Sequence, residues 1–130
     1  MKYSIGIDIG TTTVKCILFG EGVQVVAEAG REYKTLLPKA SWAQQNPEDW
    51  FTQSVEGMKE LTEGIDRSLV AGIGFGGQMH GLVILDENDK VIRPAILWND
   101  GRTTKECEYL NNTNRQESLG TEKVTNMPMI

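Results

Sequence analysis

The sequence contains few of the residues that mark several common classes of protein. Its two cysteines, Cys16 and Cys107, lie far apart and outside any CxxC spacing, so neither a disulfide framework nor a zinc site is indicated. Lysine and arginine total 13 against 18 acidic residues and form no cluster, which argues against nucleic acid and membrane surfaces as partners. No run of about 18 apolar residues occurs, and the N-terminus lacks the apolar segment of a signal peptide. We therefore expect a soluble protein of the reducing cytoplasm, folded as one domain or part of one.

What the sequence does contain is a clear strand pattern at its N-terminus. Apolar residues recur at every second position from Tyr3 to Ile9, the period of a β-strand, and Asp8 lies at the end of that pattern. Residues 11–20 are rich in β-branched and apolar types and stop at the turn signal "GEG". The next stretch, "VQVVAEA", again favours a strand. The first 35 residues therefore predict a three-stranded antiparallel meander.

A helix is predicted over residues 46–64. Asn46 is placed to be its N-cap and Pro47 to occupy its first turn, while Gly64 marks its end. Five apolar residues repeat with the helical period and are expected to face the core: Trp50, Phe51, Val55, Met58 and Leu61.

The second half of the chain alternates strand and helix signals. "LVAGIGFGG", residues 69–77, is apolar throughout and predicts a central strand buried on both faces. Residues 82–92 predict a hairpin with "DEND" as its turn, and a second helix is expected to start near Arg102. Meander, helix, strand, hairpin and helix together indicate an α/β sheet domain.

The first of three motifs is "DIGTTTVK", residues 8–15. A tight turn containing glycine directs backbone N–H groups and threonine hydroxyls at phosphate oxygens, and Lys15 would add a positive charge. Asp8 would then be placed to hold Mg²⁺ through water. The alternative is a hairpin with a threonine-rich turn and a solvated lysine, which from composition alone is at least as good an interpretation.

The second motif, "GGQMHG" at residues 76–81, contains the one histidine of the chain. Ligands often meet open sheets where a strand ends. His80 would there exchange a hydrogen bond with a substrate hydroxyl, and Met79 would pack on a carbon face. The alternative is a structural histidine in a turn. A metal site is not indicated, because there is no second histidine.

The third motif is "ILWNDGR", residues 96–102. The face of an indole stacks well on the C–H side of a sugar, so Trp98 is a candidate for such a contact. Asn99 and Asp100 would hold sugar hydroxyls. The alternative places Trp98 in the core and Asp100 at the N-cap of the following helix.

In this order and spacing the three motifs, together with "SWAQQNPEDWF", resemble the N-terminal half of the first domain of the FGGY carbohydrate kinases, most closely those that act on xylulose. The resemblance runs nearly continuously from residue 1 to about residue 107. "DIGTT" is shared with the wider superfamily of actin and the heat-shock chaperones. "GQMHG" followed by "RPAILWNDGR" is far more specific.

The resemblance implies an RNase H-like α/β domain, of which residues 1–130 would be the N-terminal portion, with the rest of that domain and a second domain absent. It implies transfer of the γ-phosphoryl group of ATP, with Mg²⁺, to O5 of D-xylulose, with Asp8 serving catalysis and Mg²⁺. The residues implied to bind phosphate are Gly10, Thr11, Thr12, Thr13 and Lys15. The residues implied to bind the sugar are Gln78, Met79, His80, Trp98, Asn99 and Asp100.

Alternatives stay open at this point. Related kinases of the family act on ribulose, gluconate or glycerol, and a non-enzymatic nucleotide-binding scaffold of the actin kind shares the first motif. The resemblance also implies that the general base and the adenosine site lie beyond residue 130, so residues 1–130 alone are not expected to turn over. It leaves a homodimer open for the full-length form.

Overall fold

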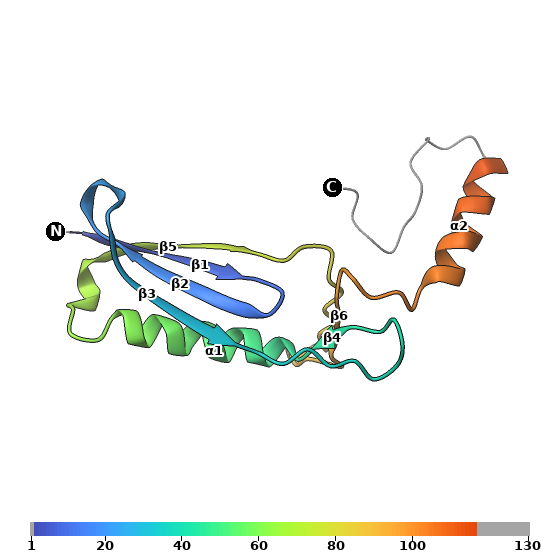
Figure 1. Cartoon of the computed structure of the whole chain (residues 1–130), viewed down its shortest axis with the longest axis horizontal. Coiled ribbons are helices and arrows are strands. Elements are labelled where there is room, and N and C mark those ends of the chain that lie inside the picture. Colours follow the sequence, from blue (N-terminus) through green and yellow to red (C-terminus); the bar gives the residue numbers. More distant parts are fainter. Residues whose placement is uncertain (1, 117–130) are drawn as a thin grey trace.

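The computed structural model describes residues 2–116 and is built on a four-stranded sheet with one helix packed against it (Figure 1). The elements, in chain order, are β1 (Tyr3–Ile9), β2 (Thr13–Phe19), β3 (Val25–Glu32), β4 (Gln44–Gln45), α1 (Pro47–Leu61), β5 (Val70–Gly77), β6 (Ala95–Ile96) and α2 (Thr104–Gln116). The predicted α/β class is confirmed. So is the predicted meander, since β1 pairs with β2 and β2 with β3, both antiparallel.

The helix α1 begins where the sequence predicts. The Asn46 side chain accepts a hydrogen bond of 3.2 Å from the backbone N–H of Glu48, and Pro47 occupies the first helical position. The helix ends at Leu61, three residues before the predicted Gly64. It packs mainly over β2 and β3, so it covers one face of the meander (Figure 1).

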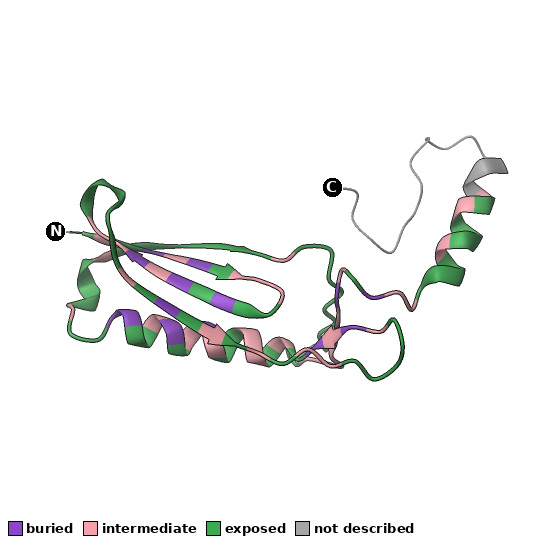
Figure 2. Cartoon of the chain, in the orientation of Figure 1, coloured by how far each residue is buried: buried purple, intermediate pink, exposed green. Residues whose placement is uncertain are grey.

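The hydrophobic core lies between α1 and the sheet. Its buried members are Ile5, Ile7, Val14, Cys16, Leu18, Ala29 and Leu61, and those on the strands alternate with exposed or partly buried residues (Figure 2). The helix approaches β2 closely because it presents Gly57 there: a Cβ at this position would lie 2.7 Å from the Cys16 Sγ. Burial raises the pKa of the Cys16 thiol, so this cysteine behaves as a small apolar core residue.

One core expectation for α1 is wrong. Phe51 is 69% exposed, whereas Ser54 and Gly57 are buried. The helix rests on the sheet through these small residues, because they allow its backbone to come close to β2. Phe51 lies off that line and faces solvent.

The strand β5 extends the sheet in the order β3-β2-β1-β5 and runs parallel to β1. The expectation that it is buried on both faces is wrong for the part of the chain that the structure describes, because β5 is exposed along almost its whole length (Figure 2). On one face α1 lies over β2 and β3 and leaves Phe75 69% exposed. On the other face the alternating residues are Gly72, Gly74 and Gly76, which have no side chain to bury.

The connection after β5 matches the sequence only in part. The predicted turn forms, with the Asp86 N–H donating to the Lys90 carbonyl at 2.8 Å, but the hairpin is limited to one bridge, between Leu85 and Val91. The short pair β4 and β6, which no periodicity indicates, joins residues 44–45 to residues 95–96.

The second helix forms as expected. Within residues 2–116, neither α1 nor α2 is both long and apolar enough to cross a lipid bilayer.

Candidate functional site

The loop between β1 and β2 has an unusual distribution of hydrogen bonds. The carbonyl oxygens of residues 10–13 all accept protein donors: Tyr33 contributes its hydroxyl and its backbone N–H, and the Gln45 Nε2 donates to the Thr11 carbonyl at 2.6 Å. Among the described residues, the backbone N–H groups of Thr11 and Thr12 have no acceptor. The loop therefore turns its carbonyls toward the protein and leaves two N–H groups available, which is the arrangement that binds anions.

Tyr33 helps to fix this loop. Its hydroxyl lies against the Gly10 carbonyl and 3.0 Å from that of Thr13, and its backbone N–H donates to the Thr12 carbonyl at 3.2 Å. Burial, with a smaller contribution from the negative charge of Asp8, raises the pKa of Tyr33 to about 12. The phenol therefore stays protonated and keeps donating.

Asp8 and Lys15 face each other across β1 and β2, on the side of the sheet away from α1. Both line an open pocket of about 400 Å³ together with Gly74 and Gly76. The Lys15 Nζ lies 3.1 Å from the Glu28 Oε2, so the ammonium group is paired with an exposed carboxylate. The Asp8 carboxylate is exposed beside it. A phosphate contact by Lys15 stays a prediction.

The second motif follows β5 at the same edge of the sheet. The Gln78 backbone N–H donates to the Ile9 carbonyl at 2.8 Å. Glycine is needed just before it, because a Cβ at Gly77 would lie 2.7 Å from the Ile9 carbonyl oxygen. His80 is exposed and has a φ of 61°, a left-handed conformation that non-glycine residues seldom adopt. Met79 is 70% exposed.

Two of the predicted sugar-binding residues line one pocket. Gln78 and His80 border an open cavity of about 480 Å³ whose wall also includes Trp50 and Leu97. Phe75 and Gly76 line both this cavity and the pocket that contains Asp8. The predicted phosphate and sugar regions are therefore neighbours along β5.

The third motif reaches the first loop through its tryptophan. Trp98 is partly buried, and its indole N–H donates to the Thr11 Oγ1 at 3.3 Å. The structure thus joins residues that are 87 positions apart in the chain. Asn99, the next residue, is exposed. Sugar contacts by Trp98 and Asn99 stay predictions.

Asp100 is placed differently from its neighbours. It is 4% exposed, and its two carboxylate oxygens accept four hydrogen bonds: from the backbone N–H groups of Ala43 and Arg102 and from two nitrogens of the Arg102 guanidinium. Burial raises the pKa of this carboxyl, but the hydrogen bonds from Arg102 and Ala43 outweigh it and hold the pKa below its usual value. The carboxylate fixes the segment to residues near β4, and a sugar contact by Asp100 stays a prediction. The alternative N-cap role is wrong, because α2 begins only at Thr104.

Gln45, which the sequence motifs do not single out, connects the other residues. It is 1% exposed, and its amide makes hydrogen bonds to Thr11, Thr35, Trp50 and Gln78. A lone polar residue produces no periodic signal. Its local cues are its place directly before the N-cap Asn46 and within the quoted segment "SWAQQNPEDWF". The three motifs do not include Tyr33 either, because its role depends on the fold of the loop that it contacts.

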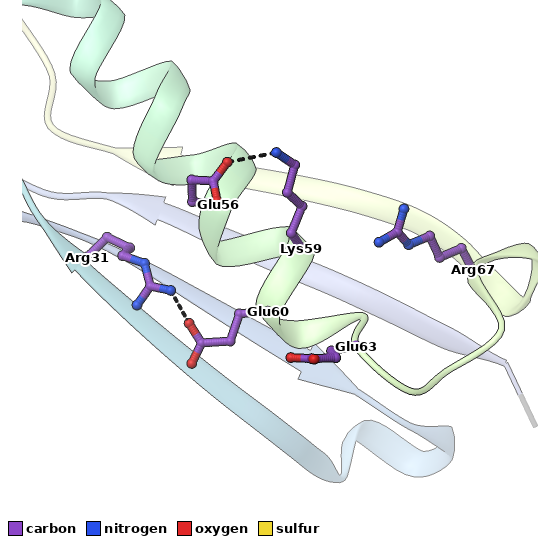
Figure 3. Close-up of a pocket in the computed structure, with 6 residues that line it drawn as sticks. All are labelled: Arg31, Glu56, Lys59, Glu60, Glu63 and Arg67. Atoms are coloured by element: carbon purple, nitrogen blue, oxygen red, sulfur yellow. Dashed lines mark hydrogen bonds and ion pairs between the residues drawn. The ribbon is translucent and has the colours of Figure 1, made fainter.

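A larger groove lies elsewhere, along α1 (Figure 3). It measures about 690 Å³ and is lined by Arg31, Glu56, Lys59, Glu60, Glu63 and Arg67. Arg31 pairs with Glu60 and Lys59 with Glu56 (Figure 3). Three positive and three negative side chains leave no net charge to attract a charged ligand, and none of the predicted site residues lies there. The candidate site is therefore the edge where β1 and β5 end.

Comparisons with known proteins identify the family of this chain. Residues 3–129 match the model of the "FGGY family of carbohydrate kinases, N-terminal domain". The xylulose kinase of Bacillus subtilis is 48% identical over 109 residues, which are 82% of this chain and 22% of that protein. The gluconokinase of the same organism is 38% identical over 102 residues, covering 78% of this chain and 20% of that protein.

A solved structure shows a similar fold. The crystal structure of xylulose kinase from Rhodospirillum rubrum superposes with a TM-score of 0.83 at 32% identity, covering 90% of this chain and 24% of that one. The chain spans about a fifth of the length of the curated relatives described above. The match to the family model extends over nearly all of its residues. The chain therefore belongs to the FGGY family of carbohydrate kinases, and residues 3–129 match the N-terminal domain of that family.

Proposed function

We propose that this chain forms one side of the active site of an ATP-dependent kinase that phosphorylates O5 of a ketopentose, D-xylulose. In this proposal residues 1–130 are the N-terminal portion of the first of two domains, and the kinase works in the cytoplasm. The observation that carries the proposal is the loop at residues 10–13, whose carbonyls are held by the protein while two N–H groups stay free. This loop lies beside a pocket lined by Gln78 and His80.

The loop is suited to the phosphate groups of ATP. The free N–H groups of Thr11 and Thr12 would donate to phosphate oxygens, and the Thr13 hydroxyl and Lys15 would add a donor and a charge. Gly10 allows the tight approach of the turn, since a Cβ at this position would lie 3.1 Å from the Thr13 carbonyl oxygen. Such contacts position the nucleotide.

Asp8 fits a role with Mg²⁺. Within residues 2–116, no three His, Cys, Asp or Glu side chains come together as a metal cage. Mg²⁺ does not require one, because it keeps several waters and is held by one or two carboxylates together with substrate phosphates. An exposed carboxylate beside the loop meets that need. Bound with ATP, Mg²⁺ would neutralise charge on the phosphoryl group during transfer.

The second and third motifs would hold the sugar. His80 would exchange a hydrogen bond with a hydroxyl, Gln78 would accept one, and Met79 would pack on carbon atoms. Trp98 and Asn99 would close the pocket from the side of the loop. The proposal assigns the general base and the adenosine site to parts of the kinase outside residues 1–130. These residues alone are then expected not to catalyse transfer.

The choice of D-xylulose is supported by the higher identity to the xylulose kinase than to the gluconokinase described above. Gluconate is the second candidate, because that gluconokinase still shares 38% identity. A non-enzymatic scaffold would need the loop but not a pocket that joins Gln78 and His80.

The test measures ADP release with Mg·ATP by the protein expressed from the full open reading frame. The sugars compared are D-xylulose, ribulose, gluconate and glycerol. Preference for D-xylulose supports the whole proposal, and preference for another sugar keeps the kinase but replaces the substrate. Absence of turnover on all four contradicts the kinase proposal.

A point variant tests the sugar pocket. His80→Ala is expected to raise the KM for the sugar about 5- to 150-fold, the loss of about 1 to 3 kcal/mol that an unpaired hydroxyl costs. The KM for ATP should stay within about threefold. An unchanged sugar KM would remove His80 from the site.

A further inference from the structure

We propose that Gln45 is a positioning residue that fixes the loop at residues 10–13, the proposed phosphate site, relative to Gln78 in the proposed sugar pocket. The inference rests on the proposed function, because it assigns a role within that same site. Gln45 lies in β4 and is 1% exposed, so its amide is removed from water. A buried amide without partners is costly, and this one is fully used.

The side chain of Gln45 makes as many hydrogen bonds as an amide can. Its Nε2 donates to the Thr11 carbonyl at 2.6 Å and to the Thr35 Oγ1 at 2.8 Å. Its Oε1 accepts from the Trp50 Nε1 at 2.9 Å and from the Gln78 Nε2 at 3.1 Å. These four partners come from four separate segments of the chain.

The orientation of the amide is fixed by chemistry. An indole nitrogen can only donate, so the Gln45 oxygen must face Trp50 and its nitrogen must face the Thr11 carbonyl. The same oxygen then requires a donor from Gln78, which places the Gln78 Nε2 toward Gln45. Reversing either amide would set like atoms against each other.

This chain of contacts has a consequence for the pocket. The Gln78 Oε1 is buried and has no donor within the described residues, while Gln78 itself lines the cavity that also contains His80. Gln45 therefore holds the loop through Thr11 and, at the same time, holds the amide of Gln78, a residue that lines the cavity. One amide links the two parts that phosphoryl transfer must align, and misalignment by about 1 Å is enough to cost about 100-fold in rate.

The experiment replaces Gln45 in the full-length kinase by methionine, which has a similar length and no hydrogen-bonding amide. We expect Gln45→Met to lower kcat at least 10-fold, while the KM values for ATP and sugar each change less than about threefold. The matched control is Gln44→Met, because the neighbouring Gln44 accepts from Arg102 and, within residues 2–116, makes no hydrogen bond to residues 10–13. Its kcat should stay within about twofold.

A measurement without substrates gives a second readout. Trp98 makes no hydrogen bond to Gln45 within residues 2–116 but donates to the Thr11 hydroxyl, so its indole ¹⁵N–¹H resonance reports on the loop. This resonance should shift in Gln45→Met and stay in place in Gln44→Met. If Gln45→Met does not fold, Trp50→Phe removes the donor that fixes the amide, and kcat should then fall at least threefold.

The outcomes separate the two proposals. A wild-type enzyme that turns over sugar, with a Gln45→Met variant that keeps the kcat and the Trp98 resonance of the wild type, overturns the positioning role and leaves the proposed function standing. A loss of kcat with unchanged KM values and a shifted resonance supports the role. A wild-type enzyme that phosphorylates none of the four sugars overturns the proposed function instead.

Discussion

The core beneath α1 and the edge where β1 and β5 end are held together by different forces. The core is built from Ile5, Ile7, Val14, Cys16 and Leu18, whose contacts are apolar and non-directional. The edge is held by directional hydrogen bonds, which Tyr33, Gln45 and Trp98 donate and the Asp100 carboxylate accepts. The difference indicates that the core decides whether the domain assembles, while the edge decides where individual backbone groups and side chains of the candidate site lie.

If this division is correct, a change at the edge can abolish turnover without affecting folding. Asp8→Asn keeps the size of an exposed side chain but removes its charge. We expect kcat of the full-length kinase to fall about 10²- to 10³-fold, because this is the loss seen when one electrostatic contact to a transition state is removed. The melting temperature and sugar binding should stay close to those of the wild type. Glu28→Gln, on the same face of the sheet, is the matched control and should change kcat less than about threefold. Wild-type turnover in Asp8→Asn would refute the role of Asp8.

The opposite behaviour is expected in the core. Leu18 is 1% exposed, and Leu18→Ala should lower the free energy of unfolding by about 3 kcal/mol through lost burial and a cavity. Its neighbour Ile17 points to the other face of the sheet and is only partly buried. Ile17→Ala should cost about 1 kcal/mol or less. Urea denaturation measures both, and equal losses would contradict the assignment of faces.

The buried pair of Asp100 and Arg102 is a charged element at the edge. Asp100→Asn should destabilise the protein by about 3 kcal/mol, because it leaves the guanidinium buried without its counter-charge. Because the pKa of Asp100 is lower in the folded state, the carboxylate stabilises the protein above its unfolded pKa of about 4, and this contribution is lost as the pH falls below that value. Denaturation at pH 7 and at pH 3 measures the free energy of unfolding of the wild type and of Asp100→Asn. The difference between the two proteins should be smaller at pH 3. A difference that is independent of pH would contradict the assignment.

The smallest expected effect concerns the contact of α1 with β2. Gly57→Ala places a methyl group against the Cys16 Sγ and should cost about 1 to 2 kcal/mol. Gly74→Ala, where a Cβ meets nothing within 4 Å, should be neutral or stabilise the strand by about 0.5 kcal/mol. Thermal denaturation distinguishes the two. Adding Cys16→Ala to Gly57→Ala should recover part of the loss, whereas full additivity of the two changes would show that they do not touch.

Much of the fold could be predicted from local pattern. The alternation from Tyr3 to Ile9, the turn at "GEG" and the N-cap at Asn46 each depend on neighbouring residues, and each element forms where expected. Expectations about burial fared less well. An apolar run such as "LVAGIGFGG" does not reveal what packs on it, and β5 is exposed within residues 2–116 because α1 lies over other strands. Phe51 fits the helical period but not the line of small residues on which α1 rests.

The candidate site, too, could be predicted from the sequence only in part. Its three motifs could be identified from the sequence, because residue types and spacing within a short segment are visible there. The free N–H groups of the loop could not, since they depend on donors from Tyr33 and Gln45 that occupy its carbonyls. The engagement of Asp100 by Arg102 and Ala43 is likewise a property of the folded chain.

The sequence by itself determined the strands β1, β2, β3 and β5, the two helices and the order of the three motifs, because backbone preferences and side-chain alternation act over a few residues. The tertiary structure alone decided that Thr11, Gln45, Gln78 and Trp98 meet at one edge of the sheet. Hydrogen bonds between such distant segments depend on the sheet and α1, which bring their backbones together. A single buried glutamine acquires its partners in that step, and for this reason its place in the site became visible only in the folded structure.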